Sequence, residues 1–395
     1  MEATLLDLLS LLIRWLHVIT GIAWIGASFY FIWLDNSLQT PPDWKAEQGI
    51  KGDLWAFHGG GVYEVAKYSA APPRMPETLH WFYWEAYSTW ITGMLLLLVV
   101  YYVQADSYLV SADSPVSGSG AAIGLSLLLI ALAVGFYEVL IRSGIAERGL
   151  PLLALGFVVL CAYSYGLTQL FSDRAAYIHL GIALGSIMVG NVFLGIIPAQ
   201  RGFVKQIEAG EEPDTLPLAQ AKLRSTHNNY MTLPVLFCMI SNHYPLLYGH
   251  RYNWLILVAV VIITGSARKY FNLKHQGIRK PEILVGCASA FAALMLALIL
   301  DARPATTRPD TVVPDDSVAM AIVAEHCTVC HAKAPSHPAF AAAPGGMILQ
   351  TREDAVALAD RALVAVGTNY MPLANMTGMS EEQRQTLLDW LGSLK

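Results

Sequence analysis

Runs of about 20 apolar residues constrain this chain most, because each is long enough to cross a bilayer as a helix. Charged residues make up only 14% of the sequence, against roughly 25% in soluble domains. This low content of charged residues predicts a membrane-lipid environment. The net charge of −5 is spread along the chain, which predicts no nucleic-acid partner. We therefore expect an all-α, polytopic membrane bundle in residues 1–300, with eight transmembrane helices. The apolar runs lie at 5–34, 80–104, 121–142, 149–171, 175–198, 229–249, 252–271 and 283–300.

The basic residues predict how this bundle is oriented. Loop 35–79, loop 199–228 and the links after the third and seventh runs together hold fifteen Lys and Arg, whereas the alternate loops hold only Arg174 and Arg251. Because Lys and Arg collect in cytoplasmic loops, we expect loop 35–79 to be cytoplasmic. Both chain termini are then expected on the periplasmic side.

The segment after the last run carries a haem-attachment motif. A proline-containing linker at 301–316 leads into a small globular unit at 317–395, which contains the sequence HCTVCH at 326–331. The spacing Cys-x-x-Cys-His is typical of covalent haem c attachment. Cys327 and Cys330 would bond the haem vinyl groups, and His331 would be the proximal iron ligand. A zinc half-site is the alternative, but no second Cys/His pair follows.

The pattern around this motif resembles a class I cytochrome c domain. Helical spacing occurs before the motif and again at 354–366, and a capping box at 380–383 opens a third helix. The sixth iron ligand should be a methionine between the last two helices. Met371, in the sequence Tyr-Met-Pro, fits best, and Met376 and Met379 are its rivals. His/Met ligation suits an electron carrier.

Histidines inside the apolar runs are candidates for haem b ligands, since ionisable residues in membrane helices are usually functional. His17 and Arg14 share a helix face at i, i+3, so His17 could bind iron while Arg14 pairs with a propionate. His179 and His243 lie at similar depth and are the expected partners of His17. These residues predict one or two b haems. The alternative is that each histidine forms a hydrogen bond between helices.

The aromatic and glycine-rich stretch in loop 35–79 is the third signal. It reads GDLWAFHGGGVYEVAKYS at 52–69 and is followed by LHWFYWEAYSTW at 79–90. Three glycines after His58 would let the backbone approach a ligand closely. A flat polar heterocycle, contacted by backbone amides and by His58 or Lys67, would suit such a loop. For the tyrosines and tryptophans alone, an interfacial aromatic belt is the favoured interpretation.

The stretches WIGASFYFIWLDNSL (24–38), WAFHGGGVYEVAKY and HWFYWEAYSTW, with eight expected spans and a C-terminal cytochrome c, resemble the membrane-bound, cytochrome c-linked urate hydroxylases of bacteria. The resemblance covers essentially the whole chain. It implies an enzyme of the bacterial inner membrane that oxidises urate to 5-hydroxyisourate. It also implies that electrons leave through the fused haem c to a respiratory oxidase or a soluble cytochrome c. The oligomeric state is not indicated.

The implied chemistry requires a base whose pKa lies near the working pH. The resemblance does not assign it, and the residues alone leave four candidates: His58, Lys67, Glu85 and His227, the last with Asn228 and Asn229 as amide partners. If urate binds at the inner loops, electrons need an intramembrane relay to reach haem c. If it binds at the outer face, they do not. Two other interpretations are a membrane-anchored electron-transfer subunit that serves a separate dehydrogenase, and a transporter.

Overall fold

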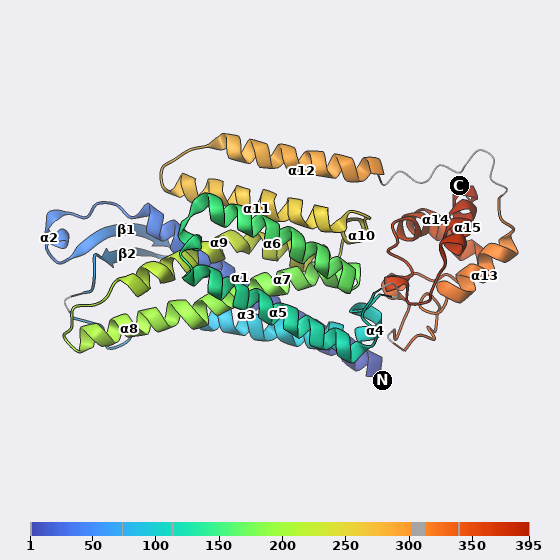
Figure 1. Ribbon diagram of the computed structural model, residues 1–395, viewed down its shortest axis with the longest axis horizontal. Helices are drawn as coiled ribbons and strands as arrows, with labels where there is room; N and C mark the ends of the chain where they lie inside the picture. Colours follow the sequence, from blue (N-terminus) through green and yellow to red (C-terminus); the bar gives the residue numbers. More distant parts are fainter. Residues whose placement is uncertain (1, 73, 112–113, 302–312, 339, 395) are drawn as a thin grey trace.

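The structure is a computed structural model that describes residues 2–72, 74–111, 114–301, 313–338 and 340–394. Long helices lie side by side in an elongated bundle (Figure 1). A small helical unit, which contains the C-terminus, lies at the end of the bundle where the N-terminus is also found.

Helices occupy all eight apolar runs. The helix α3 continues into a π-helix, η1, and α7 continues through the π-helix η3 into α8. The short elements between the long helices are α4 (Ala105–Tyr108), η2 (Ile145–Glu147) and α10 (Pro245–Tyr248). The bounds of the long helices are α1 Glu2–Ser37, α3 Trp84–Leu96, η1 Leu97–Tyr102, α5 Ser119–Arg142, α6 Gly149–Leu170, α7 Asp173–Gly190, η3 Asn191–Ile196, α8 Ile197–Glu208, α9 Leu216–Ser241, α11 Asn253–His275 and α12 Pro281–Asp301.

Among the described residues, six helices are long and apolar enough to cross a membrane: α1, α5, α6, the continuous α7–α8 helix, α11 and α12. The other two predicted spans are helical but more polar, since α3 begins with Trp84 and Glu85, and the first half of α9 carries Arg224 and His227. They pack inside the bundle, α3 against α1 and α9 against α7. The expected polar loop at 201–228 is wrong, because α8 extends to Glu208 and α9 already begins at Leu216.

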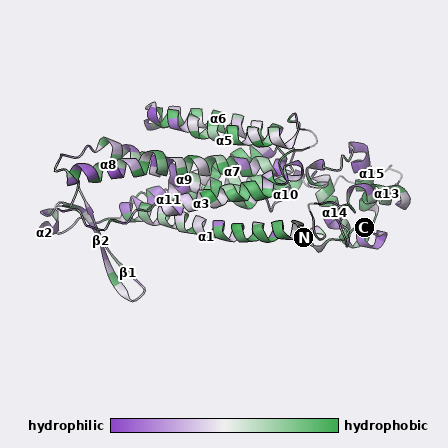
Figure 2. Cartoon of the chain, turned by 90° about the horizontal axis from the view of Figure 1, so that it is seen from below, coloured by the Kyte–Doolittle hydropathy of each residue, from purple (hydrophilic) through white to green (hydrophobic). Residues whose placement is uncertain are grey.

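The bundle has a small buried core, and many of its apolar side chains are exposed on the outer surface. Tyr101, Leu180 and Leu257 are buried in one cluster, whereas Val139, Leu150 and other large apolar side chains are exposed. Figure 2 shows hydrophobic residues along much of α1 and hydrophilic ones towards α2 and α8. Exposed apolar side chains on long helices are what a bilayer would cover.

The loop at 35–79 contains secondary structure that was not expected. After α2 (Asp43–Ala46), strands β1 (Ile50–His58) and β2 (Gly61–Tyr68) pair as an antiparallel hairpin. Its two-residue turn is Gly59-Gly60, and Gly59 has φ 60°. Glycine at the first central position is what such a tight turn requires. The all-α prediction is therefore wrong for this segment, and the hairpin projects from the far end of the bundle (Figure 2).

The C-terminal unit consists of three helices around its own core. These are α13 (Asp316–His326), α14 (Arg352–Gly367) and α15 (Glu381–Ser393), with short turns at η4 (Pro344–Gly346) and η5 (Leu373–Asn375). The predicted capping box of Ser380 and Gln383 is confirmed. Buried Val323, Leu387 and Trp390 form the core. Most of the predicted linker, residues 302–312, lies outside the described residues.

Candidate functional site

A cavity of about 740 Å³ lies in the C-terminal unit, and residues 243–246 of the bundle complete its lining. Cys327, His331 and Met371 line it, and apolar side chains such as Val323 and Leu387 complete the wall. Cofactor sites in proteins are typically apolar and measure roughly 300–1,000 Å³. The structure thus brings together three residues that the sequence assigned to haem c and surrounds them with an apolar shell.

A hydrogen bond from its Nδ1 to the backbone orients the ring of His331. The side chain is buried, and its Nδ1 lies 3.0 Å from the carbonyl oxygen of Met347. A histidine that ligates a metal usually donates its second ring N–H in this manner, which leaves Nε2 for the metal. The arrangement therefore suits an axial ligand.

The loop that carries Met371 is fixed on the other side of the cavity. Its backbone N–H donates to the Ala365 carbonyl at 2.9 Å, and its carbonyl accepts from Arg384 Nη1 at 2.7 Å. Met379 also lines the cavity and is buried, whereas Met376 is not among the described lining residues. Met371 and Met379 thus remain as ligand candidates by position.

The two cysteines do not have the character of a reactive dithiol. Burial raises the pKa of the Cys327 thiol to about 11, and it also raises the pKa of Cys330. Catalytic redox thiols have a lowered pKa instead. Cys330 lies on the same turn, with its N–H donating to the Cys327 carbonyl at 3.1 Å. Cys327 lines the cavity, and Cys330 is not among the lining residues. The lining residues, with Cys330 on the adjoining turn, fit a haem c attached near His331.

One histidine of this cavity was missed from the sequence. His326 precedes Cys327 and lines the same cavity. Its Nδ1 lies 3.0 Å from Thr377 Oγ1, and its buried Nε2 has no hydrogen-bond partner among the described residues. The haem motif drew attention to His331, and nothing in the spacing indicated that the neighbouring histidine also faces the cavity.

His17, the first choice for a haem b ligand, joins α1 to α3. Its Nδ1 lies 3.1 Å from the Thr89 carbonyl and 3.0 Å from Thr92 Oγ1. Gly93 faces the ring, because a Cβ at that position would lie 3.1 Å from His17 Cε1. Arg14, one turn away, donates from Nε to Ser10 Oγ at 3.1 Å.

His179 and His243 are not placed as partners of His17. His179 is fully buried, with Nδ1 2.7 Å from the Ala175 carbonyl and Nε2 2.7 Å from Ser126 Oγ. Both ring nitrogens of His179 are therefore within hydrogen-bonding distance of protein oxygens, one on α7 itself and one on α5. His243 is exposed and lines the 740 Å³ cavity instead. In the described chain, no hydrogen bond or ring contact joins these three histidines.

Three of the four candidate bases lie apart from one another. His58 is exposed at the tip of the hairpin. Lys67 forms an ion pair with Asp35, which also binds Lys222 at 2.9 Å. Glu85 stands in the first turn of α3, and its buried Oε2 has no hydrogen-bond partner in the described part of the chain.

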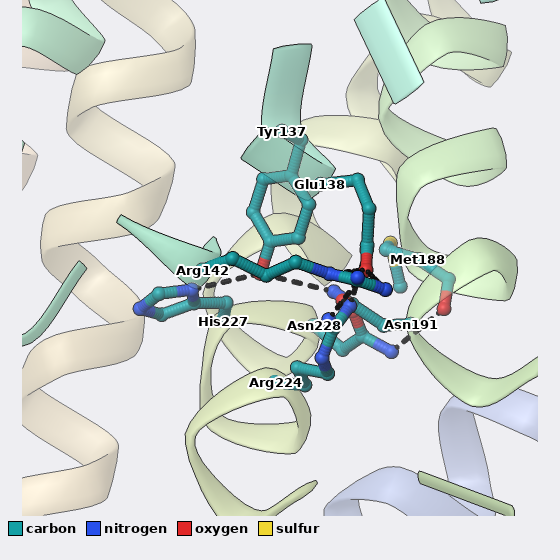
Figure 3. Close-up of polar contacts among 8 residues, drawn as sticks. All are labelled: Tyr137, Glu138, Arg142, Met188, Asn191, Arg224, His227 and Asn228. Atoms are coloured by element: carbon teal, nitrogen blue, oxygen red, sulfur yellow. Dashed lines mark hydrogen bonds and ion pairs between the residues drawn. The ribbon is translucent and has the colours of Figure 1, made fainter. Parts of the chain in front are cut away.

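His227, the fourth candidate, belongs to a buried polar network (Figure 3). Its Nδ1 lies 2.8 Å from the Tyr137 hydroxyl, which accepts a hydrogen bond from Asn191 Nδ2 at 3.1 Å. Asn191 Nδ2 also donates to Asn228 Oδ1 at 2.8 Å. Asn191 is the first residue of the π-helix η3, and such π-helical turns are frequent at functional sites.

A buried arginine completes this network. Arg224 binds Glu138 through two hydrogen bonds of 2.7 and 2.8 Å and donates to Asn191 Oδ1 at 3.0 Å (Figure 3). Gly195 makes room for it, since a Cβ there would lie 2.4 Å from Arg224 Cδ. The network links α5, η3 and α9. Its members come from three segments that are far apart in the sequence, so sequence reasoning found only His227 and Asn228.

Asn229, the second expected amide partner, points elsewhere. Its Oδ1 accepts from Arg268 Nε at 2.8 Å, and its Nδ2 is buried without a hydrogen-bond partner among the described residues. Among the described residues, no three His, Cys, Asp or Glu side chains gather as they would around a bare metal ion. A haem iron needs only two protein ligands.

The comparisons with known proteins now identify the family of the bundle. A family model described as urate oxidase N-terminal matches residues 3–300, well over half of the chain. The chain belongs to the urate oxidase N-terminal family. Membership relates it to oxidoreductases that act on urate. The matched region comprises the helical bundle and its hairpin, and the C-terminal unit lies beyond it. No curated protein and no solved structure matches the chain.

Proposed function

We propose that this protein is a membrane-bound enzyme that oxidises urate to 5-hydroxyisourate and passes the electrons to a haem c in its own C-terminal unit. The observation that carries the proposal is that a urate oxidase family bundle and a cavity lined by Cys327, His331 and Met371 occur in one chain. In the balanced reaction, the urate anion and one water give 5-hydroxyisourate, one proton and two electrons.

The residues of the C-terminal unit have defined roles in this proposal. Cys327 and Cys330 would hold the haem covalently, and His331 and Met371 would bind its iron. The bound haem supplies an acceptor for one electron at a time. The hydrogen bonds from His331 to Met347 and from Arg384 to Met371 keep both ligand-bearing segments in place. Such outer contacts commonly tune a metal site.

The proposed topology has eight crossings in a bacterial inner membrane, with α3 and α9 as the two less apolar spans. The N-terminus and the C-terminal unit lie at one end of the bundle (Figure 1), which supports placing both in the periplasm. Electrons then leave to a respiratory oxidase or a soluble cytochrome c. The basic residues of loop 35–79 lie at the opposite end, as expected for the cytoplasmic side.

An anaerobic reduction assay tests the function. Urate is added to oxidised protein while the α-band of haem c is recorded, with xanthine and allantoin as control compounds. We expect reduction by urate only, with two equivalents of reduced haem c for each urate consumed. If haem c stays oxidised while urate remains intact, the chain is instead an electron-transfer subunit that serves a separate dehydrogenase.

A further inference from the structure

A second cavity lies at the seam between the bundle and the C-terminal unit. It measures about 320 Å³ and is lined by Tyr108 of α4, by the segment 168–174, and by residues of the C-terminal unit such as Tyr370. The bundle and the C-terminal unit are in close contact here. Tyr248 and Tyr370 have ring centroids 6.0 Å apart, and a Cβ at Gly249 would lie only 2.7 Å from the Thr368 carbonyl oxygen.

Arg174 gives this cavity an unsatisfied positive group. Its guanidinium lies over the rings of Tyr108 and Tyr101, at 5.2 and 6.0 Å from their centroids. Its buried Nε has no hydrogen-bond partner among the described residues. A cation with an unpaired donor beside an open cavity favours an anionic ligand.

The other charged residues of the lining are already engaged. Asp173 accepts a hydrogen bond of 2.6 Å from Asn253. Arg384 donates to two backbone carbonyls and lies 3.8 Å from Glu381. Among the charged groups described around the cavity, Arg174 is therefore the one whose buried N–H group, at Nε, has no hydrogen-bond partner.

The neutral lining matches a flat heterocycle. Phe171 and Tyr370 supply aromatic surface, and Gln169 and Asn369 supply amide groups. Purine edges carry alternating N–H and C=O groups, which amide side chains can pair with. An arginine fork binds planar anions through two parallel hydrogen bonds.

The position of the seam cavity connects it with the 740 Å³ cavity that we propose holds haem c, called the haem cavity below. Tyr370 and Met379 line both cavities, and Met371 directly follows Tyr370 in the chain. A ligand bound beside Tyr370 would be separated from the haem cavity by a single layer of side chains. Electrons could then pass to haem c without crossing the membrane.

We propose that this seam cavity is the binding site for urate, with Arg174 pairing with the urate anion and Gln169 and Asn369 contacting its polar edge. The proposal rests on the proposed function and adds its substrate site. It places the oxidation at the outer face of the membrane. Haem propionates are the other planar anions that Arg174 could bind, and the test below separates the two sources.

The test compares Arg174→Gln with Arg251→Gln, a matched control at the same end of the bundle whose exposed side chain pairs with Asp301. Binding of radiolabelled urate is measured by anaerobic equilibrium dialysis on fully reduced protein, so that no turnover occurs. The midpoint potential of haem c is measured on the same samples. We expect Arg174→Gln to weaken urate binding by about tenfold to a hundredfold, as for loss of a charge-assisted hydrogen bond, and Arg251→Gln to leave it unchanged.

A second variant, Gln169→Trp, fills the cavity while it keeps Arg174, and should also abolish urate binding without moving the potential. This variant decides the matter if Arg174→Gln fails to fold. Unchanged urate affinity in both variants would overturn the seam site while leaving urate oxidation intact. A shifted haem potential with normal urate affinity would assign Arg174 to the propionates. If the wild-type protein neither binds urate nor is reduced by it, the proposed function fails as well.

Discussion

Three methionines line the 740 Å³ cavity: Met347, Met371 and Met379. The last two lie between α14 and α15, and their surroundings differ. Met379 is buried in the hydrophobic core, and its backbone is held by both side-chain groups of Asn375. Met371 lies on the loop that Arg384 anchors. We expect Met371→Ala to remove the methionine-to-iron charge-transfer band and to lower the haem potential, because Met ligation raises it. Met379→Leu is the control and should keep the band. A band that persists in Met371→Ala but disappears in Met379→Leu would transfer the assignment.

His17 is the residue that we expect to bind a haem b. Its Nδ1 lies within hydrogen-bonding distance of Thr89 and Thr92, and no hydrogen bond to its Nε2 occurs in the described chain. Nε2 is therefore left to bind iron. A pyridine haemochrome spectrum of purified protein separates covalent haem c from non-covalent haem b. We expect His17→Ala to lose the non-covalent haem and to keep the covalent one, and His179→Ala to keep both. If the wild-type protein contains only covalent haem, His17 is an interhelical hydrogen-bonding residue.

Local patterns predicted some of these residues and not others. The haem motif indicated His331 because both attachment and ligation occur within six residues of sequence. Arg174 was counted only as one of two basic residues in the outer loops. Its role depends on how the C-terminal unit docks on the bundle, and no local pattern encodes that contact. The glycines after His58 form the hairpin: Gly59 and Gly60 are its turn, and Gly61 begins β2.

The network in Figure 3 joins α5 to α9 through a buried ion pair. Arg224 is 5% exposed and would keep its charge if Glu138 were replaced. We expect Glu138→Gln to destabilise the bundle by about 3 kcal/mol, because a buried charge loses its partner. Arg142→Gln is the matched control: Arg142 binds the same carboxylate but its side chain is 70% exposed, so the loss should be about 0.5 kcal/mol or less. If both variants lowered the thermal unfolding temperature in detergent equally, the Arg224–Glu138 ion pair would not be what holds α5 and α9 together.

Asp316 joins the three helices of the C-terminal unit. Trp390 Nε1 and Arg352 Nε donate to its two oxygens at 2.8 and 2.7 Å, and these contacts hold its pKa below the ordinary value of 3.8. A lowered carboxyl pKa stabilises the folded state above the ordinary value, and that stability is lost as the pH falls through the folded value.

Asp316→Asn should therefore lower the unfolding temperature of this unit at neutral pH and flatten its loss below about pH 4. Haem Soret absorbance during acid titration measures the effect. Asp389→Asn, which removes only a contact within α15, should behave as the wild-type protein. An unchanged acid transition in Asp316→Asn would show that these contacts do not couple the helices.

Element positions followed the apolar runs well, because a membrane helix must satisfy its own backbone. Element ends did not. The polar half of α9 carries Arg224, His227 and Asn228, which a hydropathy pattern assigns to a loop, whereas partners on α5 and η3 keep them buried within the helix. The hairpin, in contrast, does have a local signal. Its alternating residues and Gly-Gly turn predict paired strands, but the glycines were interpreted as a ligand contact.

At the scale of the whole molecule, the two cavities lie at one end of the bundle, and loop 35–79 with its basic residues lies at the other. This arrangement bears on whether a relay through the membrane is required. A substrate that binds at the seam reaches haem c directly, whereas one that binds near the hairpin must send electrons across a hydrocarbon core of about 30 Å. The side from which urate enters therefore distinguishes the two designs.

Sealed vesicles of opposite orientation can measure that side. Urate is an anion and crosses a bilayer poorly because its charge is costly to bury. We expect external urate to reduce haem c at once in right-side-out vesicles, and in inverted vesicles only after permeabilisation. Gln169→Trp vesicles serve as the control and should respond in neither orientation. Immediate reduction in inverted vesicles alone would place the substrate at the inner loops, would refute the seam site, and would make an intramembrane haem at His17 necessary for electron transfer.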